Sequence, residues 1–335
     1  MESTNFPDSA QTIKRLGGTI KICEPIGVVR NSPIELADRL NEYIPEGKIE
    51  FSVNDSKSLG IETKKRLKNL GRSARYIEAN NTATVIYNNL VKKGADIIIV
   101  NNIAFATKGI QSIDEFSARD FGRPGRDDES GMLPPKLAMM MINLATQPLD
   151  SVIYDPFCGS GTVVTEAMLM GYKNIIGSDS SEVAINDTQK NVTWLLDRYN
   201  LDINNFNLDI FQYDATLISK RIKQNSIDAI VAEPFLGKPM RGNELISAIE
   251  SQASELKYLY TKAFAEMYKV LKPNGIIVFI IPRFHVKNEW VKIDCEKEIE
   301  KLGFENASIL PDQKHLLYWR ETQHVGREIW RFRKI

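Results

Sequence analysis

The stretch that decides the fold is Asp155-Pro-Phe-Cys-Gly-Ser-Gly-Thr162, which follows the apolar run Ser151-Val-Ile-Tyr154. This pattern predicts a buried strand, a glycine loop and a helix, and open α/β sheets bind ligands at such a junction. The two glycines let the backbone approach a ligand closely, and the helix start offers unpaired N–H groups. A dinucleotide-binding loop would have a third glycine where Val164 stands, and Asp155 would repel a pyrophosphate. The acid favours a cationic ligand group, such as the amino group of methionine.

Around this loop, short apolar runs alternate with amphipathic stretches. We expect helix 136–145, strand 151–154, helix 161–170, strand 174–178, helix 181–198, strands 208–213 and 227–232, helix 244–270, strand 275–281 and helix 287–302. Such alternation is typical of a mostly parallel sheet covered by helices. Two apolar runs near the end, 315–319 and 328–332, predict a hairpin that adds an antiparallel edge strand.

A smaller α+β domain is expected ahead of this sheet. Its predicted strands are 19–23, 48–53 and 95–100, and its predicted helices are 33–43, 61–70 and 82–93. The charge-dense stretch 117–131 has no helix or strand period, which is typical of a domain boundary. We therefore expect a first domain over residues 1–116, a linker over 117–135 and a larger domain over 136–335. The length of 335 residues fits two domains of about 150 residues each.

Composition excludes several classes of protein. Lys and Arg total 43 and Asp and Glu total 43, so any polyanion must bind to a local patch. The three cysteines are widely spaced, which argues against a disulfide framework, and the three histidines lack ligand spacing, so no metal is expected. No run approaches the roughly 20 apolar residues that span a bilayer, and the first residues lack a signal-peptide pattern. We expect a cytoplasmic protein that has no membrane partner.

Two further acids follow predicted strands of the larger domain. Asp179 closes the second strand, at the position that holds a ribose diol in such sheets. Asp214 follows the third strand and is placed to accept a hydrogen bond from the exocyclic amine of adenine. Each acid alone has an ordinary interpretation as a cap or turn former. Three acids at successive strand ends, in phase with a glycine loop, favour a binding site.

These motifs, followed by Glu233-Pro-Phe-Leu-Gly237, resemble those of class I S-adenosylmethionine-dependent methyltransferases, and are most similar to the THUMP-domain tRNA guanosine-N2 methyltransferases. Residues 119–124 and 130–138 resemble that family's approach to the catalytic domain, and residues 323–329 its closing hairpin. The resemblance implies a Rossmann-like sheet and S-adenosylmethionine as the cofactor. The cofactor-binding residues that it implies are Asp155, Pro156, Phe157, Gly159, Gly161, Thr162, Asp179, Ser180, Asp214 and Ala215.

The implied catalytic residues are Glu233, Pro234 and Phe235. The resembling family has Asp or Asn here, followed by two prolines and an aromatic residue. An exocyclic base amine is a poor nucleophile, so the site must orient it and accept its N–H hydrogens, while an aromatic ring stacks on the extruded base. In the alternative interpretation, Glu233 caps the strand end and Phe235 fills the core.

A local basic run lies in the first domain, where residues 57–75 contain seven basic side chains against one acid, Glu62. Its neighbourhood faintly resembles a THUMP module in which the usual N-terminal ferredoxin-like part is shortened. Lys64, Lys65, Lys68 and Arg72 are the predicted RNA-binding residues, because the three lysines fall near one helix face. A solvated helix face is the alternative interpretation. Two further basic groups stand at Arg119, Arg123 and Arg126, and at Arg327, Arg331, Arg333 and Lys334.

The sequence thus predicts N2-methylation of a guanosine in tRNA, of the guanosine-10 type. One alternative keeps the reaction but changes the substrate to an exocyclic amine of ribosomal RNA or DNA. Another is a non-catalytic RNA-binding protein that retains the cofactor pocket. The partner is expected to be tRNA or another structured RNA, and an activating subunit is left open.

Overall fold

The computed structural model describes residues 8–54, 56–126 and 131–335. The chain divides into two compact units, Met1–Glu115 and Phe116–Ile335. Among the described residues, no helix is both long enough and apolar enough to cross a membrane.

The first unit is a five-stranded mixed sheet in the order β1-β5-β4-β2-β3. Its strands are β1 (Lys21–Val28), β2 (Ile49–Val53), β3 (Ala74–Tyr76), β4 (Ala95–Val100) and β5 (Ile103–Ile110). Its helical segments are α1 (Ser9–Thr12), η1 (Ile13–Arg15), α2 (Pro33–Tyr43), α3 (Lys57–Asn69), α4 (Thr82–Tyr87) and α5 (Leu90–Lys93). The sequence predicted one helix over 82–93, but Asn89 adopts a left-handed φ of 54° and separates α4 from α5. The core lies between the sheet and α2 and α3, and includes Leu40, Phe51 and Leu67.

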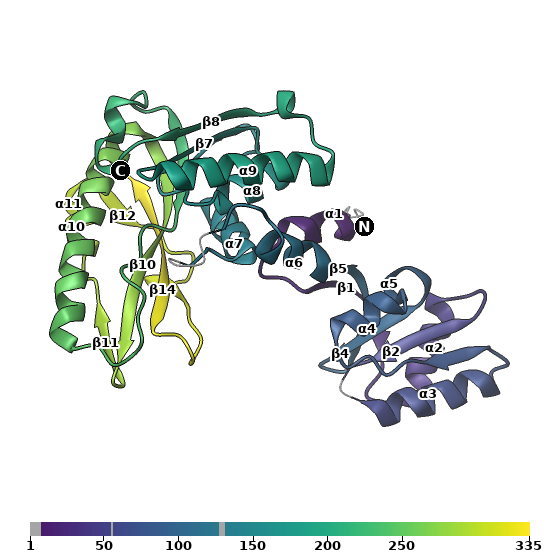
Figure 1. Cartoon of the computed structure of the whole chain (residues 1–335). Coiled ribbons are helices and arrows are strands. Elements are labelled where there is room, and N and C mark those ends of the chain that lie inside the picture. The colour runs from purple at the N-terminus through teal and green to yellow at the C-terminus, as the bar shows by residue number, and fades with distance from the viewer. Residues whose placement is uncertain (1–7, 55, 127–130) are drawn as a thin grey trace. The chain divides into compact units, whose positions relative to one another are not determined.

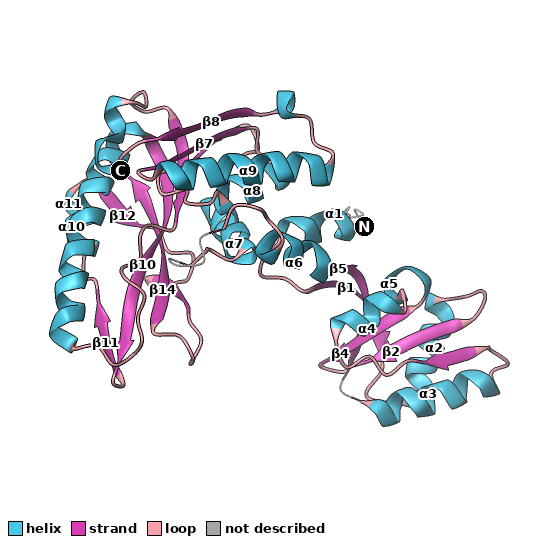
Figure 2. Ribbon diagram, in the orientation of Figure 1, coloured by secondary structure: helices cyan, strands magenta, loops and turns pink. Residues whose placement is uncertain are grey.

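The second unit is built on a nine-stranded sheet, seven of whose strands run in the order β12-β14-β10-β9-β6-β7-β8. Figure 2 draws the strands in magenta and the helices in cyan. Its strands are β6 (Val152–Asp155), β7 (Asn174–Asp179), β8 (Asn207–Gln212), β9 (Ile227–Ala232), β10 (Leu271–Val286), β11 (Glu289–Lys292), β12 (Phe304–Asn306), β13 (His315–Tyr318) and β14 (Val325–Lys334). The five strands from β6 to β10 are parallel, whereas β14 pairs antiparallel with β10. The prediction of a mostly parallel sheet with an antiparallel C-terminal addition is confirmed, although β12 and β13 pair with β14 along its outer side.

Helices cover both faces of this sheet (Figure 1). The helical segments of this unit are α7 (Pro135–Ala145), α8 (Thr162–Leu169), α9 (Glu182–Tyr199), η2 (Ile203–Asn205), η3 (Ala215–Lys220), α10 (Ile246–Val270) and α11 (Glu296–Lys301). One core packs α7, α8 and α9 on one face, and another packs α10 on the other, where Phe279 contacts the rings of Tyr260 and Phe264. Because β6 lies between β7 and β9, the strand order reverses there, which opens a ligand crevice at the carboxyl ends of the strands.

The predicted linker over 117–135 is wrong in its first part. Helix α6 (Ile113–Phe121) occupies it, and the division between the units falls inside this helix. Phe116 packs in the core of the second unit, and Arg119 Nε donates a 2.6 Å hydrogen bond to Glu166 Oε1 of α8. Arg119, one of the charges that suggested a domain boundary, is therefore used in a buried ion pair. Residues 127–130 of this stretch lie outside the described part of the chain.

The predicted helix over 287–302 is also wrong in its first part. Lys287 and Asn288 both adopt left-handed φ values, 48° and 66°, and form a tight turn between β10 and β11. Two consecutive positive φ values are typical of a hairpin turn. Only Glu296–Lys301 is helical.

Candidate active site

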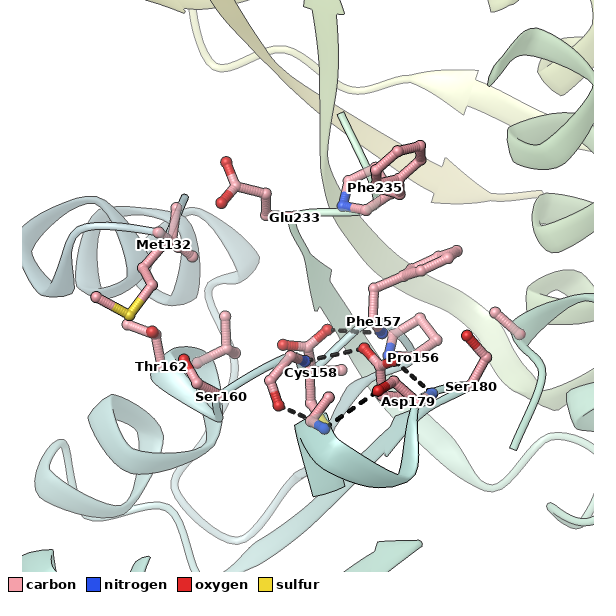
Figure 3. Close-up of a pocket in the computed structure, with 18 of the residues that line it drawn as sticks. Met132, Pro156, Phe157, Cys158, Ser160, Thr162, Asp179, Ser180, Glu233 and Phe235 are labelled. Carbon is pink, nitrogen blue, oxygen red and sulfur yellow. Dashed lines mark hydrogen bonds between the residues drawn. The ribbon is translucent and has the colours of Figure 1, made fainter. Parts of the chain in front are cut away.

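A pocket of about 890 Å³ lies in the second unit, at the carboxyl ends of β6, β7 and β9. Its volume is within the usual range for cofactor and substrate sites, roughly 300–1,000 Å³. All the predicted catalytic and cofactor-binding residues line the pocket except Gly161. Figure 3 shows Glu233 and Phe235 toward one end and Asp179 and Ser180 toward the other, with Pro156 and Phe157 between them.

Asp155 supplies a buried carboxylate to this pocket. Its exposed fraction is 3%, and its Oδ1 accepts a 3.0 Å hydrogen bond from the backbone N–H of Phe157. Burial raises the pKa of Asp155 well above its ordinary value, and the nearby acids Asp179 and Glu233 add to this effect. No Lys or Arg of the described residues forms an ion pair with it. A buried acid without a protein cation fits a cationic ligand group.

The two loop glycines have different roles. Gly159 has a φ of 52°, and a Cβ placed on it would meet nothing within 4 Å, so its backbone faces open space in the pocket. Gly161 is the N-cap of α8 with a φ of 83°, and its Cβ would lie 2.7 Å from Thr188 Cγ2 of α9. Gly159 therefore leaves space in the pocket where a side chain would stand, whereas Gly161 lets α8 and α9 pack closely.

Asp179 and Asp214 both hold backbone groups in place. The Asp179 carboxylate accepts hydrogen bonds from Gly159 N (3.0 Å) and Ser181 N (2.9 Å), so it ties the glycine loop to the start of α9 (Figure 3). Asp214 Oδ1 accepts from the N–H and hydroxyl of Thr216, at 2.8 Å each, and caps η3. The capping interpretation is therefore correct for Asp214, although the same side chain lines the pocket.

The end of β9 brings an acid and an aromatic ring to the pocket. Glu233 is almost buried, and Arg327 Nε of β14 donates a 2.6 Å hydrogen bond to its Oε1. Burial raises the pKa of Glu233, and Arg327 opposes that shift. Phe235 is 52% exposed, so it does not fill the core as the alternative interpretation required. The buried Tyr260 hydroxyl donates a 2.6 Å hydrogen bond to Phe235 O and fixes this backbone.

Sequence reasoning missed some of the residues that line the pocket. Met132 and Leu133, from the segment that was taken as a linker, line the pocket together with Val183 and Ala184 of α9. The last two lie in the first turn of α9, four and five residues after Asp179, and the position of that turn beside the strand end would have suggested them. Arg123, also placed in the linker, is buried and donates from Nη1 to Thr162 Oγ1 at 2.6 Å. No group of three or more potential metal-binding side chains occurs among the residues that the structure describes.

The predicted RNA-binding residues lie on or just after α3 of the first unit. All the residues that line the pocket belong to the second unit. Lys65 and Lys68 are exposed and Lys64 is half-buried, and none of the three has a described partner. Arg72 differs, because its guanidinium donates to Asn41 Oδ1, Ile44 O and Gly47 O. These bonds close the loop after α2, so the Arg72 guanidinium is used within the first unit and is not a free contact for RNA.

The basic cluster at the end of the chain is likewise used internally. Arg331 donates to the carbonyls of Leu144 and Ala307, and Lys334 donates to three acceptors, including Leu271 O at 2.8 Å. Arg333 is paired with Glu305 on the neighbouring strand. These side chains hold β14 in the sheet and offer little free charge to a polyanion.

The fold and the site together define a class I, Rossmann-like methyltransferase. The chain matches the family model described as RMKL-like, methyltransferase domain over residues 123–309. This match covers more than half of the chain, which therefore belongs to that family. The family and fold that the sequence predicted are confirmed.

Relatives and solved structures agree with this assignment. The tRNA (guanine(10)-N2)-dimethyltransferase of Methanocaldococcus jannaschii is 28% identical over 218 residues, 62% of this chain and 52% of that protein. The enzyme of the same name from Pyrococcus abyssi is 30% identical over 159 residues, 46% of this chain and 45% of that protein. The chain thus spans about half the length of these curated relatives. Among solved structures, TrmN from Thermus thermophilus is 13% identical and superposes with a TM-score of 0.52. The match covers all of this chain and 88% of TrmN, and it shows a shared fold.

Proposed function

We propose that this chain transfers a methyl group from S-adenosylmethionine to the N2 amine of a guanosine in cytoplasmic tRNA, with the guanosine at position 10 as the first candidate. The observation that carries the proposal is the single pocket in which a buried acid, a glycine loop and the Glu233-Pro-Phe segment meet. The names of the curated relatives support the substrate.

The residues present fit this cofactor on two counts. Asp155 is a buried acid that lacks a described cation, which suits the positively charged amino group of the cofactor. Gly159 leaves open pocket space where a side chain would stand. Asp155, Asp179 and Asp214 would hold the methionine, ribose and adenine parts. The chemistry that the cofactor supplies when bound is a methyl group made electrophilic by its sulfonium.

The protein's own part in the reaction is to orient the target amine. The lone pair of an exocyclic amine is delocalised into its ring, so the amine must be held and its N–H hydrogens accepted as the new bond forms. Glu233 accepts one of these hydrogens, and the exposed ring of Phe235 stacks on the extruded base. The proposed role of the first unit is RNA docking through the lysines of α3, as a THUMP-like domain.

The test measures incorporation of labelled methyl groups into a tRNA, compared with the same tRNA carrying inosine at position 10. Inosine lacks only the N2 amine, so we expect transfer to the guanosine form alone. We expect Glu233→Gln to reduce the rate at least 10²-fold, the usual contribution of a positioned acid–base group. Glu289→Gln, an exposed acid of β11, is the matched control and should leave the rate unchanged.

Two results separate the alternatives. Equal, background-level incorporation by wild type and Glu233→Gln into tRNA, ribosomal RNA and DNA, with cofactor still bound, would favour the non-catalytic RNA-binding protein. Methylation of ribosomal RNA or DNA in preference to tRNA would move the reaction to another polymer.

Asp179→Ala should weaken cofactor binding, and unchanged affinity would contradict the pocket assignment.

A further inference from the structure

Glu233 is held by an arginine that comes from a distant part of the chain. Arg327 lies on β14, and β10 separates that strand from β9, after which Glu233 follows. The bond from Arg327 Nε to Glu233 Oε1 is 2.6 Å, and the two side chains are only 13% and 11% exposed. An ion pair this well shielded is weakly screened by solvent and strongly directional.

The other groups that face Glu233 do not favour its charge. Asp155 of β6 is a second acid close enough to interact with it, and Tyr260 of α10 is buried and neutral. Burial raises the pKa of Glu233, and Arg327 is the charged group that opposes this shift. Without Arg327, the environment would favour the protonated acid.

The protonation state decides what Glu233 offers to a ligand. An ionised carboxylate only accepts hydrogen bonds, whereas a protonated one presents an O–H donor that an amine N–H cannot use. In the observed pair, Oε1 is taken by Arg327, and no described residue donates to Oε2. The second oxygen is therefore left for a ligand in the pocket.

We propose that Arg327 is a positioning residue that keeps Glu233 ionised and oriented, so that Oε2 accepts an N–H hydrogen of the target amine. This inference rests on the proposed methyl transfer. Arg327 acts through Glu233 and needs no contact with the base. The alternative is that Arg327 contacts an RNA phosphate, which would affect tRNA binding without affecting the acid.

The experiment measures methyl transfer against pH for the wild type, Arg327→Gln and Arg327→Lys. Loss of a neighbouring positive charge raises a carboxyl pKa by roughly 1–3 units. The acid limb of the pH–rate profile should therefore move to higher pH by that amount in Arg327→Gln. Activity should fall about tenfold for each pH unit below the limb and recover at high pH. Arg327→Lys keeps the charge but loses the planar guanidinium, so its limb should stay near that of the wild type with a lower kcat.

Arg333→Gln is the matched control, because Arg333 lies on the same strand and pairs with an exposed acid, Glu305, away from the pocket. Its profile should equal that of the wild type. An unshifted acid limb in Arg327→Gln, or a higher KM for tRNA as its sole effect, would overturn the proposal. A limb in Arg327→Lys that moves as far as in Arg327→Gln would also overturn it, because the lysine keeps the positive charge.

A second readout separates this inference from the proposed function. Carbon-13 NMR of the glutamate carboxyls, with the Glu233 signal assigned by Glu233→Gln, follows its titration directly. We expect the Glu233 midpoint to rise in Arg327→Gln, whatever the substrate. If the wild type methylates no guanosine but this midpoint rises, the proposed function fails and the pairing stands. If the midpoint does not move, the positioning role is refuted even in an active enzyme.

Discussion

The two loop glycines allow a sharp test of the site, because alanine should affect them in different ways. Both have positive φ values, 52° for Gly159 and 83° for Gly161. An alanine in this region costs about 1–2 kcal/mol at either position. Only at Gly161 does the new Cβ meet packed atoms, at 2.7 Å from Thr188 Cγ2 and 2.9 Å from its Oγ1.

The clash should be expensive because Thr188 has little freedom to move. It is fully buried on α9, and its hydroxyl donates a 2.7 Å hydrogen bond to Gly159 O. Overpacking of this kind adds roughly 1–3 kcal/mol. We therefore expect Gly161→Ala to destabilise the second unit by about 2–5 kcal/mol, from the strain and the clash together. Gly159→Ala should destabilise it by about 1–2 kcal/mol.

Urea unfolding followed by tryptophan fluorescence measures this difference. All four tryptophans, Trp194, Trp290, Trp319 and Trp330, belong to the second unit, so the signal reports on that unit alone. With a slope near the upper end of 1–3 kcal/mol per molar urea, the two midpoints should differ by roughly 0.3–1 M. Equal midpoints would refute the packing role of Gly161.

For cofactor affinity, we expect the larger loss in Gly159→Ala and the smaller one in Gly161→Ala, which is the reverse of their order in stability. The methyl group of Gly159→Ala enters open pocket space, so we expect its affinity for S-adenosylmethionine to fall at least about tenfold, or 1.4 kcal/mol. Folded Gly161→Ala should bind within a few fold of the wild type, because Gly161 does not line the pocket. Calorimetric titration at a temperature where both variants are folded measures this, and an unchanged affinity of Gly159→Ala would refute the reasoning.

Two further outcomes are expected. Because burial raises the folded-state pKa of Asp155, its acid contributes stability at low pH that is lost as the pH rises through that value. Asp155→Asn should therefore be more stable than the wild type at pH 7, although it should bind the cofactor more weakly. Its stability advantage should vanish below pH 3.8, the ordinary pKa of an aspartate. Urea unfolding at a series of pH values measures this. Replacing Lys64, Lys65 and Lys68 with alanine should weaken tRNA binding and lower the salt slope by about 0.7–0.9 per lost phosphate contact; filter binding at several salt concentrations measures it, with Lys92→Ala as control.

The glycine loop and the acids after β6, β7 and β8 could be predicted because each depends on a short stretch of sequence. An apolar run that ends in an acid or a glycine marks a strand end, and parallel strands bring their carboxyl ends to one edge. This local rule found Asp155, Asp179 and Asp214. It did not find Arg327, because the pair with Glu233 joins residues 94 positions apart, across an intervening strand.

The linker error has a different physical origin. Charge-dense sequence usually indicates solvent exposure, and Arg119 and Arg123 lie in such a stretch. Their charges are buried because Glu166 and Thr162 of α8 supply partners, and that helix lies more than 35 residues further along the chain. A pattern within one segment cannot reveal a partner supplied by another.

The neutral total charge of the chain hides an uneven use of its basic residues, because several arginines of the second unit have internal partners. Arg119 is paired inside the second unit, Arg123 is hydrogen-bonded there, and Arg327 is paired with Glu233 beside the pocket. The acids of the strand ends face the pocket itself. The second unit thus pairs these arginines internally, around a pocket whose lining has more acids than bases, which suits a cationic cofactor. We therefore propose that a polyanionic substrate uses positive charge outside this pocket, and Lys64, Lys65 and Lys68 of α3, which have no described partner, are the candidates.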